Sequence, residues 1–345
     1  MDWSIVVTVL VTILIFGIII FIHELGHFLV AKACGIQVNE FALGMGPTIL
    51  KKQGKNTLYA LRAFPIGGFV SMEGEDSSSE NQNAFCNKPV WKRILVVLTG
   101  PVMNLILGFI VVLVMVICTP LVGSTTVARF EEGALSAQTG LQVGDEIKSI
   151  NGSPVFVDND IVYGLLRAED GNADITVVRD GKTVNLDNVK FAVTDTGEGA
   201  PQITIDFKVQ AIEKDFFSVI KAAAMKTVSI MRAIWVSLFD LITGNYGIND
   251  LSGPIGVGQV VNQALQLGWM SLLSLVAFIS INVGIFNFIP FPALDGWRIL
   301  VLIVEGIRRK PMNPKIESGV NVVGLVLLMG LMVVVACSDV LKLFQ

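Results

Sequence analysis

Long apolar stretches dominate the pattern of this chain and predict membrane-spanning helices. A helix that crosses a bilayer needs about 20 mostly apolar residues. Four stretches meet this requirement: Ile5–Phe21, Ile94–Thr119, Ser271–Ile289 and Ser318–Cys337. The first has no positively charged segment before it and no small-residue cleavage site after it. We therefore interpret it as a retained helix and not as a signal peptide.

Residues Phe216–Thr243 are also mostly apolar, but charged side chains recur among them at helical spacing. These are Lys221, Lys226, Arg232 and Asp240. A helix with one apolar and one polar face is typical of a membrane surface. We expect this segment to lie at the interface, which leaves about four transmembrane helices.

Residues 120–215, between the second and third apolar stretches, follow a different pattern. Short runs rich in β-branched residues, such as Thr125–Phe130 and Ile175–Arg179, alternate with the turn sequences Asn151-Gly152 and Asp180-Gly181. This alternation predicts a small β-rich domain.

Composition supports a membrane protein. The 345 residues are 52% hydrophobic and only 16% charged, whereas a soluble domain is about 25% charged. The net charge of −4 gives no indication of a nucleic-acid partner. The four cysteines form no CxxC pair, so they predict neither a disulfide framework nor a zinc finger.

Basic residues predict the orientation, because cytoplasmic loops are enriched in Lys and Arg. The loops after the first and third predicted spans carry such clusters, including Lys51-Lys52 and Arg308-Arg309-Lys310. Residues 120–215 instead hold 8 Lys and Arg against 16 Asp and Glu. We therefore expect the two basic loops to be cytoplasmic, and residues 120–215 and both termini to be extracytoplasmic.

The first apolar stretch runs into the sequence HELGH at residues 23–27. Glu24 is the only charged residue between Ile5 and Val30, and His23 and His27 are the only histidines of the chain. On a helix these imidazoles share a face and can bind one metal ion. HExxH is typical of zinc metalloproteases, with the glutamate as general base. The alternative is a set of interhelical hydrogen bonds, which the cost of an ionisable residue inside a membrane disfavours.

Catalytic zinc usually has three protein ligands, and the third must here be a carboxylate or a cysteine because no other histidine exists. Asp295, in the sequence NFIPFPALDGWR, is our candidate. It follows the third apolar stretch at about the depth that His23 has in the first. Both should end near the cytoplasmic side of the membrane. A helix cap beside a loop is the alternative interpretation of Asp295.

HELGH at 23–27, followed by N-x-x-P-x-P-x-L-D-G at 287–296, resembles the site-2 protease family of intramembrane zinc metalloproteases, most closely the bacterial regulator of sigma-E protease type. The resemblance covers nearly the whole chain. Residues 41–47 and 64–75 are similar to the membrane-associated β-hairpin region of the family, 98–104 to the start of its second helix, and 251–259 to the stretch before its third.

This resemblance implies that His23, His27 and Asp295 bind Zn²⁺ and that Glu24 is the catalytic base. It further implies four substrate-binding positions, at Asn282, Asn287, Pro290 and Pro292. Each proline removes a backbone N–H and bends the chain, which would let Asp295 turn inward and leave carbonyls to pair with a substrate strand. Interhelical hydrogen bonding is the alternative role of the two asparagines.

Residues 133–155 are similar to the signature of PDZ domains. In it, Gly140 and Gly144 would permit tight turns, and Ile147 and Ile150 would lie in the core. We expect one extracytoplasmic, β-rich PDZ domain that binds peptides by strand addition. A rigid structural plug is the alternative.

The sequence thus predicts a polytopic α-helical membrane protein in four segments. Residues 1–119 hold the first two transmembrane helices, HExxH and a β-hairpin region on the cytoplasmic side. Residues 120–210 form the PDZ-like domain, 211–270 an amphipathic, interfacial helical segment, and 271–345 the last two transmembrane helices.

The family resemblance implies a multi-pass protease of the bacterial plasma (inner) membrane that hydrolyses peptide bonds within or near transmembrane segments. Its partners would be the lipid bilayer and single-span substrates, such as anti-sigma factors and signal-peptide remnants, and no nucleic acid. One alternative is a non-catalytic scaffold that holds a partner through the PDZ-like domain and does not need Glu24. A metal transporter is disfavoured, because the second and fourth spans have almost no polar residues.

The charge distribution generates a topology prediction. A cysteine introduced at Ser153 should react with a membrane-impermeant thiol reagent on intact cells, because residues 120–215 are expected outside. A cysteine at Ser78, in a predicted cytoplasmic loop, should be protected. Labelling at Ser78 with protection at Ser153 would invert the predicted orientation.

Overall fold

The apolar stretches fold into long helices, and the β-rich segment folds separately from them. The structure, a computed structural model, describes residues 3–75, 77–168, 171–194, 202–244 and 251–342. By its internal contacts the chain divides into two compact units, residues 1–111 with 238–345 and residues 112–237. The predicted segments 1–119 and 271–345 thus contribute most of one unit, and 120–210 most of the other.

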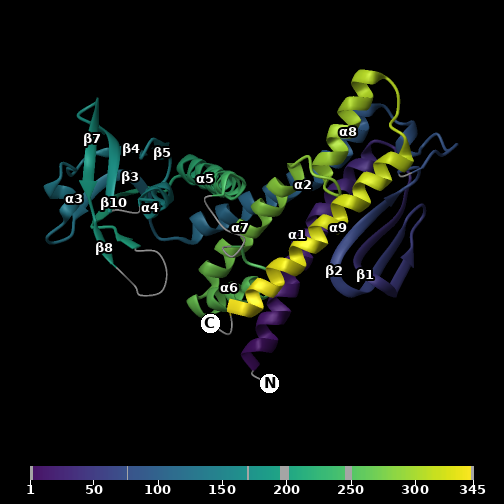
Figure 1. The fold of residues 1–345 in the computed structure, drawn as a ribbon, viewed down its shortest axis with the longest axis horizontal. Helices are drawn as coiled ribbons and strands as arrows, with labels where there is room; N and C mark the ends of the chain where they lie inside the picture. Colours follow the sequence, from purple (N-terminus) through teal and green to yellow (C-terminus); the bar gives the residue numbers. More distant parts are fainter. Residues whose placement is uncertain (1–2, 76, 169–170, 195–201, 245–250, 343–345) are drawn as a thin grey trace. The chain divides into compact units, whose positions relative to one another are not determined.

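Five helices of the described residues are long and apolar enough to cross a membrane (Figure 1). Four contain the predicted spans: α1 (Trp3–Ala33), α2 (Val90–Cys118), α7 (Trp269–Phe288) and α9 (Pro314–Lys342). The fifth is α5 (Phe216–Thr243), which the sequence pattern assigns to the membrane surface. The chain is a multi-pass membrane protein. The shorter helices are η1 (Phe85–Asn87), α6 (Pro254–Leu267) and α8 (Asp295–Arg308).

Helices α2 and α7 pack closely because small residues lie where they meet. A Cβ at Gly108 would lie only 2.4 Å from Cγ1 of Ile281. The Ser280 hydroxyl donates a hydrogen bond of 2.8 Å to the carbonyl oxygen of Asn104. Within a bilayer, such close contacts and interhelical hydrogen bonds replace the hydrophobic effect as the force between helices.

Strands β1 (Val38–Gln53) and β2 (Leu58–Met72) form the predicted β-hairpin region. Both are long and bend, so that Glu40–Leu43 pairs with Leu58–Leu61 and also with Gly68–Ser71. Gly67, with φ 85°, adopts a backbone conformation at one bend that other residues rarely adopt. Within the described pairings, residues 68–72 form an outer row of this sheet, and β2 contacts α1.

The second unit contains the predicted β-rich domain. Its main sheet has the order β10-β3-β4-β6-β7, with β5 paired to β4, and β8 pairs with β9. The strands are β3 (Val122–Phe130), β4 (Glu146–Ile150), β5 (Ser153–Pro154), β6 (Asn172–Arg179), β7 (Lys182–Lys190), β8 (Ala192–Thr194), β9 (Gln202–Thr204) and β10 (Phe207–Ile212). Two short helices, α3 (Leu135–Gln138) and α4 (Asp158–Leu166), lie between strands of this domain in the described part of the chain.

Several expectations for this domain are confirmed. Gly140 and Gly144 have φ of 117° and 93°, as the tight turns require. Ile147 and Ile150 are fully buried in the core cluster. Asn151, with φ 48°, lies in the predicted turn between β4 and β5.

A buried ion pair explains why an aspartate follows Gly144. The Asp145 side chain is 0% exposed, and its two carboxylate oxygens accept hydrogen bonds of 2.7 Å each from Nε and Nη2 of Arg179. Arg179 also donates to the carbonyl oxygen of Gly140. This hydrogen bonding to Asp145 raises the pKa of Arg179 above its ordinary value. The pair joins the turn before β4 to the end of β6.

Helix α5 presents a polar face to the β-rich domain within the second unit. Lys226 pairs with Asp158 at 3.4 Å, and Arg232 with the buried Asp160 at 2.9 Å. The Ser229 hydroxyl, one turn from each cation, also donates to Asp160. The aromatic rings of Phe216 and Phe217 on the same helix are largely exposed. The amphipathic character predicted from the sequence is therefore present in the folded helix.

The Asp145–Arg179 pair generates a stability prediction. Asp145→Asn should destabilise the second unit by about 1–3 kcal/mol, because a buried position loses its charge-assisted hydrogen bonds to Arg179, which is itself 24% exposed and keeps part of its hydration. Hydrogen–deuterium exchange of β4 and β6 in the full-length protein measures the change.

The neighbouring Glu146→Gln is the matched control, because Glu146 and its partner Lys148 are 42% and 45% exposed. Exposed pairs contribute little, so exchange should stay at the wild-type rate. Equal effects of the two substitutions would contradict a structural role for Asp145.

Candidate metal centre

His23 and His27 lie one turn apart on the same face of α1, as the HExxH spacing predicts. Their rings meet edge to face with centroids 4.8 Å apart. The two Nε2 atoms are 3.2 Å apart. The side chains are only 12% and 11% exposed, so both imidazoles lie inside the helical unit with little access to water.

Asp295 reaches the histidines because the helical structure is interrupted between α7 and α8. Helix α7 ends at Phe288, and Pro290 and Pro292 lie in the connection. Ala293 has φ 77°, a left-handed backbone conformation that residues other than glycine rarely adopt, shortly before Asp295 begins α8. At the following position, a Cβ on Gly296 would lie 2.4 Å from the carbonyl oxygens of Phe288 and Ile289. Glycine is therefore required for the first turn of α8 to pack against the end of α7.

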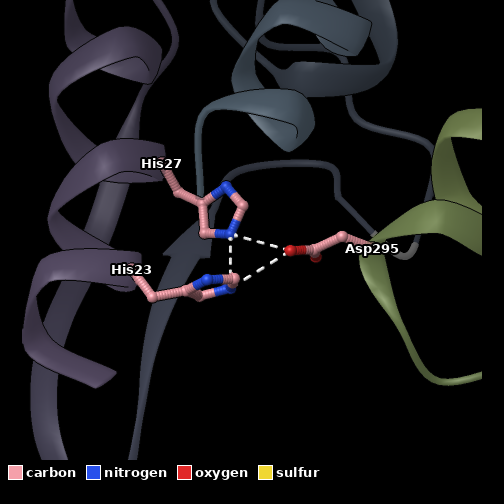
Figure 2. A group of neighbouring side chains, drawn as sticks. All are labelled: His23, His27 and Asp295. Carbon is pink, nitrogen blue, oxygen red and sulfur yellow. Dashed lines mark hydrogen bonds and ion pairs between the residues drawn. The ribbon is translucent and has the colours of Figure 1, made fainter. Parts of the chain in front are cut away.

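The three candidate ligands turn their donor atoms toward one another (Figure 2). Oδ2 of Asp295 lies 3.1 Å from Nε2 of His23 and 3.4 Å from Nε2 of His27. Four ligands at zinc's usual distance of about 2.0–2.1 Å, arranged as a tetrahedron, are separated by about 3.3 Å. Oδ2 is buried, and its contacts with the rings lack the direction of a hydrogen bond. The donor set, its spacing and this buried oxygen all fit a zinc ion.

Helix α2 forms the floor under the two imidazoles. The carbonyl oxygen of Val96 is 2.9 Å from Nδ1 of His27. A Cβ on Gly100 would lie 2.2 Å from Nε2 of His27 and 2.9 Å from Cε1 of His23. The side chain of Asn104 contacts Nδ1 of His23 at 3.3 Å. Positions 96, 100 and 104 recur every four residues, so one face of α2 meets both rings.

A cavity of about 180 Å³ adjoins the metal centre. Its lining comprises His23, Glu24, His27, Phe69, Val70, Met72, Glu75, Val97, Asp295 and Arg298. Gly68 leaves room for Glu24, since a Cβ there would be 3.1 Å from Cγ of the glutamate. The Glu24 carboxylate, the three candidate ligands and the outer row of the β1–β2 sheet therefore all face the same cavity.

Arg298 connects the helix that carries Asp295 to the end of β2. It donates a 2.6 Å hydrogen bond to the carbonyl oxygen of Glu75, and its guanidinium lies 5.1 Å from the ring centre of Phe85. The Glu75 carboxylate in turn accepts from the backbone N–H of Met72 at 3.3 Å. The positions of α8 and of the strand row in the cavity are thus linked.

The structure brings together His23, His27 and Asp295 and places Glu24 beside them. The predicted substrate-binding residues lie elsewhere among the described residues. Asn282 and Asn287 lie on α7, where the Asn287 amide donates to the Val283 carbonyl of its own helix. With Pro290 and Pro292, they are absent from the described lining of the cavity. Their role in substrate binding stays a prediction.

Sequence reasoning did not identify Gly100, Asn104, Glu75 or Arg298 as parts of the site. For the first two a signal existed, because an asparagine inside an uncharged span is costly and it lies four residues after a glycine. Glu75 and Arg298 gave no comparable signal, since charged residues beside a loop are ordinary.

Comparison with known proteins identifies a family and several relatives of this chain. A family model described as peptidase family M50 matches residues 11–331. The chain is 31% identical to the regulator of sigma-W protease RasP of Bacillus subtilis, over 98% of this chain and 99% of that protein. It is 34% identical to a putative zinc metalloprotease of Clostridium acetobutylicum, over 96% and 97%. A putative zinc metalloprotease of Fusobacterium nucleatum is 33% identical, over 98% and 100%.

The close approach of α2 generates a prediction. Gly100→Ala should sharply reduce bound zinc, because the new methyl group would occupy the space of both imidazoles. Helix formation should not suffer, since alanine is favoured over glycine in a helix by about 1 kcal/mol. Elemental analysis of the purified protein measures the zinc.

Gly330→Ala on α9 is the matched control, because a Cβ there has no neighbour within 4 Å in the part of the chain that the structure describes. It should retain a full complement of zinc. A Gly100→Ala protein with as much zinc as this control would show that the rings can move aside.

Proposed function

The chain belongs to peptidase family M50 and is a zinc metalloprotease with Zn²⁺ as its cofactor, and we propose that it cleaves its substrates within the membrane. One observation carries this proposal. The donor atoms of His23, His27 and Asp295 lie within 4.8 Å of one another, next to a cavity that Glu24 also lines. The histidines belong to a helix apolar enough to span a bilayer.

The proposed chemistry is hydrolysis of a peptide bond. When bound, zinc supplies a Lewis acid that polarises the scissile carbonyl and lowers the pKa of the attacking water. His23, His27 and Asp295 would hold the ion, and three protein ligands are the number that catalytic zinc usually has. Glu24 follows His23 by one residue, so it points about 100° away around the helix. It is therefore placed to accept the proton from the water and to pass it to the leaving amine.

Substrate would enter as an extended strand. A transmembrane helix hides its amides in hydrogen bonds to the preceding turn, so it must unwind locally before attack. Phe69, Val70 and Met72, from the outer row of the β1–β2 sheet, line the cavity. An outer strand presents backbone groups that an extended peptide can pair with. Asn282, Asn287, Pro290 and Pro292 would hold the substrate further from the metal.

We place four helices across the membrane and α5 at its outer surface. The contacts of Lys226, Ser229 and Arg232 with the β-rich domain support this placement, because ion pairs with a polar domain are unfavourable at the bilayer centre. The β-rich domain, a PDZ domain in this proposal, then faces the extracytoplasmic side. The metal centre lies toward the cytoplasmic side of the bacterial plasma membrane.

The proposed substrates are single-span membrane proteins such as anti-sigma factors, together with signal-peptide remnants. The name of the Bacillus subtilis relative connects that protein with regulation of sigma-W, which supports this class of substrate. A scaffold that binds a partner through the PDZ domain is the second candidate. The position of Glu24 in the cavity favours catalysis, because a scaffold needs no general base.

Substitutions of Glu24 and of Asp295 should have different effects on bound zinc and on cleavage. Glu24→Gln keeps the shape of the side chain and removes its basicity, so it should retain zinc and lose at least about 10²–10⁴-fold in cleavage rate. Asp295→Ala removes a ligand, so zinc content should fall together with activity. Bound zinc and cleavage of a panel of single-span substrates in detergent, with and without a chelator, measure both effects.

Glu40→Gln provides the matched control, because that carboxylate pairs with Arg62 and is not among the described residues that line the cavity. Its zinc content and cleavage should stay near wild type. Loss of zinc from Glu24→Gln with retention in Asp295→Ala would reverse the two assignments. Undiminished cleavage by Glu24→Gln would favour the scaffold.

A further inference from the structure

Asn104 of α2 is a buried polar residue beside the metal centre. It is 0% exposed, and within the described residues its Oδ1 atom has no hydrogen-bond partner. A buried polar atom without a partner costs free energy. Its presence beside a histidine therefore calls for a physical explanation.

The backbone around Asn104 is held in place from two sides. Ser280 of α7, itself 0% exposed, donates its hydroxyl to the Asn104 carbonyl oxygen at 2.8 Å. Gly100, one turn earlier on α2, lies directly under the imidazoles. The Asn104 amide is thus kept next to the His23 ring. It can still rotate about the bonds of its own side chain.

The two imidazoles have different neighbours on their far sides. Nδ1 of His27 faces the Val96 carbonyl oxygen at 2.9 Å, so this nitrogen carries the proton and Nε2 is left to bind a metal. Nδ1 of His23 faces Nδ2 of Asn104 at 3.3 Å. That contact suits a ring whose proton is on Nε2, which is the nitrogen that points toward Asp295.

A His23 ring that binds zinc through Nε2 must carry its proton on Nδ1. Two donors would then face each other across the contact with Asn104. A half-turn of the amide exchanges Nδ2 for Oδ1 and provides an acceptor. The same movement gives the otherwise unpartnered Oδ1 a hydrogen bond.

We propose that Asn104 is a positioning residue of the zinc centre, whose Oδ1 accepts the Nδ1–H of His23 in the zinc-loaded protein. It does for His23 what the Val96 carbonyl oxygen does for His27. This inference rests on the ligand set proposed above. Such partners fix the tautomer and orientation of a ligating histidine and make it more basic, and their loss weakens metal binding by about 10–100-fold.

Zinc affinity of the full-length protein in detergent, measured by competition with a chelator, tests the proposal. Asn104→Leu preserves size and removes the acceptor, so affinity should fall about 10–100-fold. Asn104→Asp preserves an acceptor and should bind zinc more tightly than Asn104→Leu. Asn262→Leu is the matched control, because Asn262 also bonds between helices, to Thr8 at 3.2 Å, and should leave affinity unchanged.

The histidines give a second, direct readout, because the chain has only two of them. In zinc-loaded protein labelled with ¹⁵N-histidine, both Nδ1–H protons should be observed in NMR spectra as hydrogen-bonded. Asn104→Leu should move one of them to the position of a weaker hydrogen bond. The other, which faces Val96, should stay in place and serves as the internal reference.

The outcomes separate this inference from the proposed ligand set. If wild-type protein binds zinc, Asp295→Ala weakens binding, and Asn104→Leu retains wild-type affinity and both NMR signals, the positioning role alone is wrong. If Asn104→Asp weakens binding as much as Asn104→Leu, the acceptor role is wrong. If Asp295→Ala binds zinc as tightly as wild type, the ligand set itself fails.

Discussion

Helix α2 passes so close to the imidazoles of His23 and His27 that only glycine fits at position 100. Within a membrane there is no water to satisfy polar side chains, so protein groups must do so. One face of α2 supplies them at successive turns: a carbonyl oxygen at Val96, open space at Gly100 and an amide at Asn104. The orientation of both rings therefore depends on this approach between two helices.

The third candidate ligand depends on a separate device, the break between α7 and α8. The left-handed backbone at Ala293 and the tight packing of Gly296 against the end of α7 place Asp295 at the start of α8, where it faces the histidines. Arg298, one turn later, connects the same helix to Glu75, three residues after the end of β2. Helix α8, which carries Asp295, is thereby connected to the strand β2 that lines the cavity. A movement of one of these elements would therefore displace the other.

Much of the fold could be predicted from the sequence, because its signals are local. An uninterrupted apolar run fixes a spanning helix, and β-branched runs between turn residues fix short strands. The weakest prediction concerned Phe216–Thr243, whose length and composition allow a span while its charged residues favour the surface. Contacts of Lys226 and Arg232 with the β-rich domain show what the polar face does, which no pattern within the segment could reveal.

For the candidate site, the sequence by itself determined that His23 and His27 share a helix face with Glu24 beside them, because a spacing of four residues has that meaning on any helix. It also selected Asp295, because this carboxylate follows the third apolar stretch at about the depth that His23 has in the first. Only the tertiary structure decided that Asp295 meets the histidines at 3.1 and 3.4 Å, and that Gly100, Asn104, Glu75 and Arg298 surround them. Those residues come from segments far apart in the chain, and their contacts follow from how helices and strands pack, which no local pattern encodes.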